Sequence, residues 1–301
     1  MASHPTSLKF TKMHGLGNDY IYVEGFTQPL DDLDAPALCR RMSDRHKGIG
    51  ADGLILIRPP SPGAAADVRM EMYNADGSRG EMCGNGIRCV AKYVLERGLA
   101  KPQASGLKPQ ASLRVETDRG VLDLTCHRSP DGKIDRVRVN MGEPILKPTD
   151  IPVTMDGPRC VRQPLSVGEE QYEMTCVSMG NPHAVFYLPS LEAMDLARLG
   201  PIIERHPVFP NRINVHVAEA VSRCEVTMRT WERGTGLTQA CGTGACSVLV
   251  AGVLEGRLER SALIHLPGGD LEIEWDEATN SVFKTGPATE VFNGEWRIQE
   301  V

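Results

Sequence analysis

The stretch Met82-Cys-Gly-Asn-Gly-Ile-Arg-Cys89 has a close counterpart later in the chain, Gln239-Ala-Cys-Gly-Thr-Gly-Ala-Cys246. Each stretch places a cysteine before a glycine-rich turn. A second pair of matches, Gly17-Asn18 and Gly180-Asn181, precedes the two cysteines in the same order and at nearly the same separation. A strand-like segment comes before each cysteine and a helical pattern follows it. The repeats therefore indicate a chain made of two similar halves.

The two helical patterns differ in their polar faces. Residues 87–97 place apolar side chains at Ile87, Val90, Ala91, Val94 and Leu95, which is the spacing of an amphipathic helix. Residues 245–254 are apolar nearly all round, so a helix there has to be buried on most sides. A curved sheet that encloses the helix would satisfy this requirement.

Strands dominate the rest of the pattern. Alternating apolar and polar residues predict half-buried strands at residues 68–73, 113–117, 121–126, 136–140, 213–217, 224–231, 271–275 and 290–298. The segment Lys101-Pro-Gln-Ala-Ser105 is repeated as Lys108-Pro-Gln-Ala-Ser112, which indicates a surface loop lengthened by a small duplication. Pro144 and Pro148 mark a linker between the halves.

Composition narrows the class of protein. The 301 residues are 41% hydrophobic and 24% charged, as in globular proteins, and carry a net charge of −6. Few aromatic residues and a negative charge disfavour nucleic-acid binding. The sequence contains no apolar run long enough to cross a membrane, and its polar first ten residues do not have the apolar core expected of a signal peptide. Nine cysteines without a framework spacing predict reduced thiols in a cytoplasmic compartment.

Cys83 and Cys241 are the candidate catalytic residues. A cysteine that precedes a helix lies at the positive end of the helix dipole, which favours the thiolate and predicts a lowered thiol pKa. The exposed N–H groups of the same turn form a site for a carboxylate. Inverting a stereocentre needs one group that removes a proton and another that returns a proton on the opposite face. Two duplicated thiols can perform that task without a cofactor.

These residues resemble the diaminopimelate epimerase family. The resemblance covers essentially the whole chain. It rests on five motifs in the family's order: Lys12-Met-His-Gly-Leu-Gly-Asn-Asp-Tyr20, Asn74-Ala-Asp-Gly-Ser78, the Cys83 stretch, Gly180-Asn-Pro-His183, and Glu232-Arg-Gly-Thr-Gly236 with the Cys241 stretch.

The resemblance implies an α+β fold of two similar halves, each a curved, mostly antiparallel sheet or barrel around a central helix. We expect residues 1–142 to form the half with Cys83 and residues 143–287 the half with Cys241, with a strand at about 288–301 returning to the first half. The implied activity is the interconversion of LL- and meso-diaminopimelate for lysine and peptidoglycan synthesis, with no cofactor and no metal. Members are often homodimers, and the expectation extends to this chain.

The resemblance also assigns the substrate contacts. Gly84, Asn85, Gly242 and Thr243 would hold the carboxylate beside the reacting carbon, with Asn18 close by. The far end of the substrate would be read by Asn74, Asn181, Asn214, Glu232 and Arg233. His183 matches a histidine near the thiols, with either an orienting or a direct catalytic role. One departure is Gly53, where many members carry a glutamine that contacts the substrate.

Four alternatives stay open at this stage. A proline or hydroxyproline racemase or epimerase would use the same two cysteines, but the distal pair Glu232 and Arg233 would then have no ligand group. A cysteine hydrolase built on Cys83 and His183 leaves the second cysteine motif unexplained. A zinc protein is disfavoured because the Cys and His spacing fits no zinc template. A binding module without activity would bind ligand without proton exchange.

Overall fold

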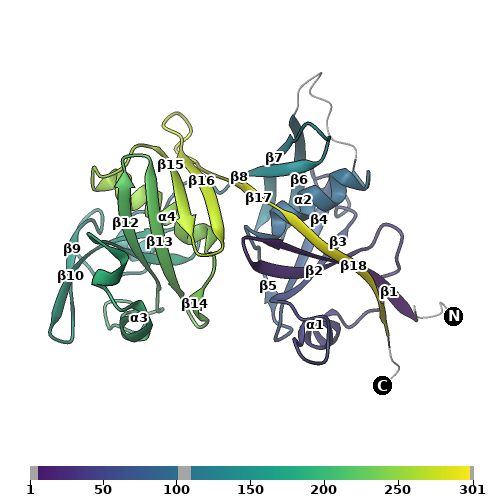
Figure 1. The fold of residues 1–301 in the computed structure, drawn as a ribbon, viewed down its shortest axis with the longest axis horizontal. Helices are drawn as coiled ribbons and strands as arrows, with labels where there is room; N and C mark the ends of the chain where they lie inside the picture. Colours follow the sequence, from purple (N-terminus) through teal and green to yellow (C-terminus); the bar gives the residue numbers. More distant parts are fainter. Residues whose placement is uncertain (1–5, 101–109, 299–301) are drawn as a thin grey trace. The chain divides into compact units, whose positions relative to one another are not determined.

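The computed structural model describes residues 6–100 and 110–298, and they form two compact units. Unit 1 comprises residues 1–139 and 286–301, and unit 2 comprises residues 140–285. Both units consist mainly of strands around a few helices (Figure 1). This is the predicted α+β architecture.

Unit 1 is a strongly curved sheet with a helix inside it. Its strands are β1 (Ser7–Gly15), β2 (Asn18–Glu24), β3 (Gly53–Arg58), β4 (Val68–Asn74), β5 (Arg79–Gly80), β6 (Gln110–Thr117), β7 (Gly120–Arg128), β8 (Ile134–Asn140) and β18 (Thr289–Arg297). Neighbouring strands run antiparallel except for β2–β3 and β4–β6, which are parallel. Helix α1 (Ala35–Ser43) connects β2 to β3, and α2 (Gly86–Glu96) lies between β5 and β6 in the chain.

Unit 2 repeats this arrangement. Its strands are β9 (Gln163–Val167), β10 (Glu170–Ser178), β11 (Pro182–Tyr187), β12 (Asn214–Ser222), β13 (Glu225–Glu232), β14 (Gly236–Thr238), β15 (Ser261–Leu266), β16 (Gly269–Trp275) and β17 (Val282–Pro287). The parallel pairs are β11–β12 and β13–β15, and the others are antiparallel. Helix α3 (Leu196–Glu204) connects β11 to β12, and α4 (Gly242–Leu254) connects β14 to β15.

The strand order makes the two units equivalent element by element. The parallel step after α1 in unit 1 corresponds to the step after α3 in unit 2, and α2 corresponds to α4. One pair of corresponding strands comes from different parts of the chain. In unit 2, β9 pairs with β10 and directly precedes it in the chain, whereas in unit 1 the strand that pairs with β1 is β18, from the C-terminal end. Equivalent positions in the two units can therefore be compared directly.

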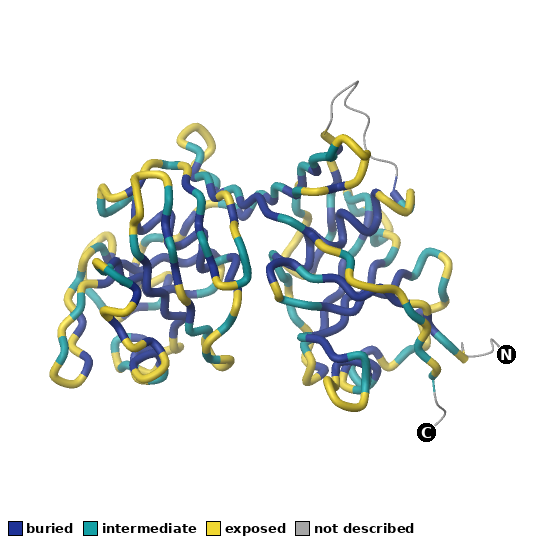
Figure 2. Tube along the Cα trace, in the orientation of Figure 1, coloured by how far each residue is buried: buried dark blue, intermediate teal, exposed yellow. Residues whose placement is uncertain are grey.

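The central helices are the most enclosed helices among the described residues (Figure 2). Ten residues of α4, from Gly242 to Gly252, are buried, including Ser247 with no exposed surface. Helix α2 is buried along most of its length as well, and its charged residues Arg88 and Lys92 are both enclosed. The all-apolar pattern of the second helix thus predicted its environment correctly, although α4 begins at residue 242 rather than 245.

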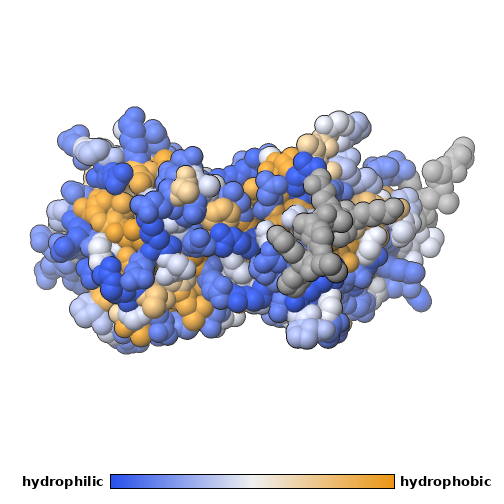
Figure 3. Space-filling model, turned by 90° about the horizontal axis from the view of Figure 1, so that it is seen from above, coloured by the Kyte–Doolittle hydropathy of each residue, from blue (hydrophilic) through white to orange (hydrophobic). Residues whose placement is uncertain are grey.

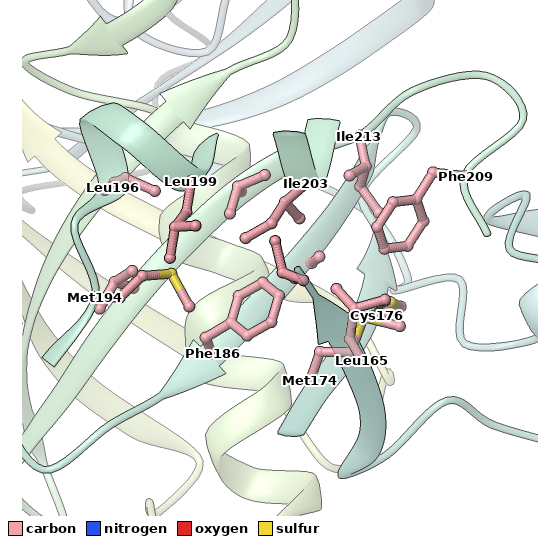
Figure 4. Packing of buried hydrophobic residues seen from close by; sticks show 14 of the residues in the cluster. Leu165, Met174, Cys176, Phe186, Met194, Leu196, Leu199, Ile203, Phe209 and Ile213 are labelled. Carbon is pink, nitrogen blue, oxygen red and sulfur yellow. Dashed lines mark hydrogen bonds between the residues drawn. The ribbon is translucent and has the colours of Figure 1, made fainter. Parts of the chain in front are cut away.

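The outer face of each sheet packs on the connecting helix. In unit 2, Leu196, Leu199 and Ile203 of α3 meet Phe186 and Met174 of the sheet (Figure 4). Because side chains alternate along a strand, Ala184 and Phe186 of β11 enter this outer core while His183 points to the other face. The alternation decides which residues of β11 reach the start of α4.

The duplicated segment lies largely outside the described residues. Residues 101–109 belong to that part, and Gln110, Ala111 and Ser112 form the start of β6. The prediction of a loop was therefore wrong for the last three residues, because they extend the pairing of β6 with β7. Among the described residues, no helix is long and apolar enough to span a membrane.

Polar and charged residues cover most of the face seen in Figure 3, with apolar patches between them. One polar contact on the unit 2 sheet is pH-sensitive. His265 of β15 lies 2.8 Å from Asp270 through Nδ1 and 3.0 Å from Glu225 through Nε2. The hydrogen bonds to Asp270 and then Glu225 raise the pKa of His265 above its ordinary value.

We expect His265→Gln to destabilise the protein only at low pH. Because the folded-state pKa lies above the unfolded value of about 6.5, the stabilisation is complete below pH 6.5 and disappears as the pH rises through the folded-state value. For this partly exposed group the loss at pH 6 should be about 0.5–1 kcal/mol, and near zero at pH 9. Urea unfolding at both pH values measures it, with His127→Gln as the control. A loss of equal size at both pH values would contradict the ionic explanation.

Candidate active-site residues of the two units

Cys83 lies at the start of α2, and the first turn of the helix faces its sulfur. The backbone N–H of Gly86 donates to Cys83 Sγ at 3.3 Å, and Cys83 Sγ lies 3.2 Å from Asn18 Oδ1. Asn85 Nδ2 donates to the same Asn18 oxygen at 3.5 Å. The predicted residues Asn18, Cys83 and Asn85 therefore lie together.

The side chain of Asn18 is fixed by a charged network. Asn18 Nδ2 donates to Asp52 Oδ2 at 2.8 Å, and Arg45 binds both Asp52 and Asp19 at 2.8 and 2.7 Å. Lys12 forms a second ion pair with Asp19. Because the amide nitrogen is held by Asp52, the amide oxygen of Asn18 is turned toward Cys83.

Arg88 holds the turn after Cys83 through hydrogen bonds from its buried side chain. This side chain has no exposed surface, and its guanidinium donates to Gly84 O and Asn85 Oδ1, each at 3.0 Å, and to Pro287 O at 3.0 Å. A Cβ on Gly15 would come within 2.8 Å of Arg88 Nη2, so the guanidinium fills the space beneath the turn. The sequence analysis gave Arg88 no role, because a charged residue on an amphipathic helix is usually solvated.

Tyr20 is the neighbour of Cys83 that the sequence did not predict. Burial and then the Cys83 sulfur raise the pKa of the Tyr20 hydroxyl far above its ordinary value, so this group stays protonated and can donate a hydrogen bond. Tyr20 pairs with Gly53 across β2 and β3. A Cβ on Gly53 would lie 2.1 Å from Tyr73 O and 2.8 Å from the Tyr20 ring, so no side chain fits there. The glycine at this position is explained by packing.

Asn74 ends β4 and is held by a local turn. Its backbone N–H and its side-chain Nδ2 donate to Ser78, at 2.8 Å to O and 3.0 Å to Oγ. The side chain is partly exposed.

Cys241 occupies the equivalent position before α4, but its environment differs. Its side chain lies 3.7 Å from Thr243 Oγ1 and is only 3% exposed. Burial and then the charge of Glu232 raise the pKa of Cys241 well above its ordinary value. The predicted lowering of this pKa was wrong, since burial and the carboxylate outweigh the N–H of Gly244 and the Thr243 hydroxyl.

A chain of hydrogen bonds, partly exposed at Thr243 and Asn181 and buried at the two histidines, leads from Cys241 into the sheet. Asn181 Nδ2 donates to Thr243 at 3.3 Å, and Asn181 Oδ1 lies 3.0 Å from His183 Nε2. His183 Nδ1 then lies 2.8 Å from His216 Nε2, and His216 Nδ1 lies 3.0 Å from Thr230 Oγ1 on β13.

Donor roles along the chain follow from the orientation of Asn181. Since its amide nitrogen serves Thr243, its oxygen accepts the proton on His183 Nε2, and His183 Nδ1 accepts from His216 Nε2. Burial lowers the pKa of His216 to about 3, and burial together with the charges of His216 and Arg233 lowers the pKa of His183 well below its ordinary value. Both imidazoles are therefore neutral, which favours an orienting role for His183.

The remaining predicted residues of unit 2 surround the end of β13. Asn214 is buried and joins two strands, because its Nδ2 donates to Pro182 O at 2.8 Å and its Oδ1 accepts from Arg233 N at 2.9 Å. Arg233 is exposed, and its guanidinium donates to Asn211 O at 2.9 Å. Glu232 accepts from Thr238 at 2.6 Å.

Each unit thus holds one group of predicted residues. Those in unit 1 are Asn18, Asn74, Cys83, Gly84 and Asn85, and those in unit 2 are Asn181, His183, Asn214, Glu232, Arg233, Cys241, Gly242 and Thr243. The residues that the sequence analysis missed are Tyr20, Arg88 and His216. For His216, a signal was present in the alternation of β12, which puts it on the same face as Asn214.

The two equivalent units, each with a cysteine at the start of its buried central helix, form a fold that is also found in solved structures of other proteins. The structural matches agree on the fold. They include a hydroxyproline epimerase from Agrobacterium vitis, with a TM-score of 0.64, 16% identity, and coverage of 97% of this chain and 91% of that one. A phenazine biosynthesis protein of the PhzF family from Bacillus anthracis gives a TM-score of 0.68 at 16% identity, with coverage of 98% and 100%.

Sequence comparison then gives the family. The family model for diaminopimelate epimerase matches residues 10–147 and 175–291. A diaminopimelate epimerase from Acetivibrio thermocellus is 50% identical over 296 residues, with coverage of 98% of this chain and 100% of that protein. One from Methanococcus maripaludis is 46% identical over 288 residues, with coverage of 96% and 99%. The chain belongs to the diaminopimelate epimerase family.

We expect Arg88→Met to lower the stability of the protein and to change the reactivity of the Cys83 thiol. The variant leaves the Gly84 carbonyl and the Asn85 side chain without their buried donor, so the free energy of unfolding should fall by about 2–4 kcal/mol. Arg88→Lys should restore little of it, because an ammonium cannot reproduce the planar fork. Thermal unfolding and the rate of Cys83 alkylation measure the two effects. Wild-type values for both in Arg88→Met would contradict the assigned role.

Proposed function

We propose that this chain epimerises LL-2,6-diaminopimelate to meso-diaminopimelate, without a cofactor, in the synthesis of lysine and of peptidoglycan precursors. The observation that carries the proposal is the duplication of a thiol at the start of the buried central helix in two equivalent units. Family membership supports the choice of substrate. A cytoplasmic location and a homodimer stay predictions from the sequence.

The chemistry that we assign to the thiols is a two-base exchange. One cysteine, as the thiolate, takes the α-proton, and the bond electrons remain on the carbon and its carboxylate. The other cysteine, as the thiol, gives its proton to the opposite face of the same carbon. Each turnover thereby exchanges the protonation states of Cys83 and Cys241, and the reverse reaction restores them.

The start of each central helix is suited to the charge that develops. N–H groups in the first turn of a helix have no acceptor within the helix, and the helix dipole favours an anion there. We assign Gly84, Asn85, Gly242 and Thr243 to the substrate carboxylate on this basis. Donors that face the developing enediolate stabilise the transition state by several kcal/mol.

The distal amino-acid group would be recognised by Arg233 and Glu232. Arg233 is exposed at the end of β13, and its backbone is fixed by the buried Asn214. A guanidinium can bind a carboxylate in bidentate fashion, and a carboxylate can accept from an ammonium. Asn74 and Asn181 add amide donors and acceptors. In this assignment Asn18 and His183 orient groups next to the thiols.

Proton exchange tests the proposed reaction. Reduced protein incubated with LL-diaminopimelate in D₂O, without cofactor, should give meso product with deuterium at one α-carbon. Cys83→Ala and Cys241→Ala should each lower the rate by at least about 10²–10⁴-fold, because each removes an acid–base group. Cys224→Ser changes an exposed cysteine and serves as the matched control. A folded wild-type protein that gives neither meso product nor deuterium would overturn the proposal.

Substrate choice is tested at Arg233. We expect Arg233→Gln to lower kcat/KM for LL-diaminopimelate about 10–100-fold, mainly through KM, since a hydrogen bond to a charged group contributes about 1.5–3 kcal/mol. Arg229→Gln, which changes an exposed arginine paired with Glu192, should leave kcat/KM unchanged. Racemisation of proline or hydroxyproline at a higher kcat/KM than diaminopimelate would favour the alternative substrate class instead.

A further inference from the structure

Three soft donor groups meet at the inner end of the Cys241 site. His183, His216 and Cys241 each offer a donor atom that lies within 4.8 Å of the donor atoms of the other two. They come from β11, β12 and the residue before α4, so no sequence spacing would connect them. The two histidines have no exposed surface, and the cysteine is 3% exposed.

The hydrogen bonds around the cluster leave the inner nitrogens of both histidines facing each other. His183 Nε2 is engaged with Asn181 Oδ1 at 3.0 Å, and His216 Nδ1 with Thr230 Oγ1 at 3.0 Å. The inner pair, His183 Nδ1 and His216 Nε2, is 2.8 Å apart. A histidine that binds a metal through one nitrogen normally donates a hydrogen bond through the other. His183 already donates to Asn181, and His216 would donate to Thr230 once its proton moves to Nδ1.

A tetrahedral zinc site would require small shifts of the donor atoms, which lie within 4.8 Å of one another. Zinc binds imidazole nitrogen at about 2.0–2.1 Å and thiolate at about 2.3 Å, which places the ligand atoms of a tetrahedron roughly 3.3–3.7 Å apart. The 2.8 Å between the histidine nitrogens would need to widen by about 0.5 Å. Three protein ligands leave a fourth position for water.

Binding of a divalent ion would release the thiol proton. The charged groups next to the cluster are the Glu232 carboxylate, which interacts with Cys241, and the Arg233 guanidinium, which interacts with His183. The bound M²⁺ would be offset by one thiolate and by the Glu232 carboxylate. The proton on His216 Nε2 moves to Nδ1, from which it can be donated to Thr230.

We propose that His183, His216 and Cys241 form an inhibitory site for Zn²⁺ or a similar soft divalent ion, bound through His183 Nδ1, His216 Nε2 and Cys241 Sγ. Thiolate and imidazole select zinc, cadmium and cobalt(II), whereas magnesium and calcium require oxygen ligands. The ion is a reversible inhibitor rather than a resident cofactor. The inhibition, but not the binding, rests on the proposed function, because the ion occupies the sulfur that exchanges the proton.

Cobalt(II) binding can be measured by visible absorption, without an activity assay. Titration of the reduced, full-length protein under anaerobic conditions should give the thiolate-to-cobalt charge-transfer band and the visible bands of tetrahedral Co²⁺, saturating at one equivalent. Zn²⁺ should abolish the bands by competition, and Mg²⁺ in excess should not.

The variants separate this site from the other thiols. Cys241→Ser and His216→Asn should lose the charge-transfer band, whereas Cys83→Ser and Cys224→Ser should keep it. Thr230→Val leaves all three ligands but removes the outer bond of His216, so cobalt affinity should fall about 10–100-fold. Circular dichroism and thermal unfolding establish that each variant is folded.

The outcomes are distinct. Absence of the band in the wild type, or its persistence in Cys241→Ser, would overturn the proposed metal site. A wild-type band that depends on Cys241 and His216, in a protein that does not epimerise diaminopimelate, would support the metal site and refute the proposed function. In an active enzyme, epimerisation should fall in proportion to the fraction of sites occupied by Zn²⁺ and return with EDTA. Full activity at full occupancy would overturn the inhibitory role.

Discussion

Burial of the two central helices is the constraint on which the rest of the structure depends. Helix α4 has no polar face, so sheet has to surround it, and α2 is enclosed in the same way. Each central helix lies in the connection between two parallel strands, β4 and β6 for α2 and β13 and β15 for α4. A second parallel pair in each unit, β2–β3 and β11–β12, is connected through the outer helix. In each unit the start of the helix, where the cysteine lies, has polar neighbours.

The same backbone arrangement carries different chemistry in the two units. The carbon that Gly86 would gain as alanine meets Ile55 in unit 1, whereas at Gly244 it meets His216 in unit 2. Cys83 has the amide of Asn18 and the hydroxyl of Tyr20 beside it, while Cys241 has a carboxylate and a chain of imidazoles. The different environments bias which sulfur holds the proton, whereas the proposed reaction exchanges the protonation states of the two sulfurs at each turnover.

The groups that hydrogen-bond around each thiol also differ between the two units. Arg88 and the Asp52 network fix the turn and the amide next to Cys83, and the chain that ends at Thr230 fixes those next to Cys241. Buried polar groups of this kind need complete hydrogen bonding, since an unpaired one costs about 1–3 kcal/mol. The hydrogen-bond partners of the outer nitrogens hold the inner nitrogens of the two histidines toward each other, so one set of contacts would support both the proposed catalytic geometry and the proposed inhibition.

The sequence by itself determined the fold class, the two central helices and most strands, and it identified Cys83 and Cys241 as candidate catalytic residues. These features follow from periodicity and short repeats, which are local properties of the sequence. It also gave the family through motifs, and the matches confirm that assignment. Tertiary structure alone decided what surrounds each sulfur. Tyr20, Arg88 and His216 reach the sites through strand register and burial, which relate residues far apart in the chain. The predicted direction of the Cys241 pKa shift was wrong for the same reason. A helix start next to the cysteine can be predicted from sequence, but the burial of the thiol and the position of Glu232 cannot.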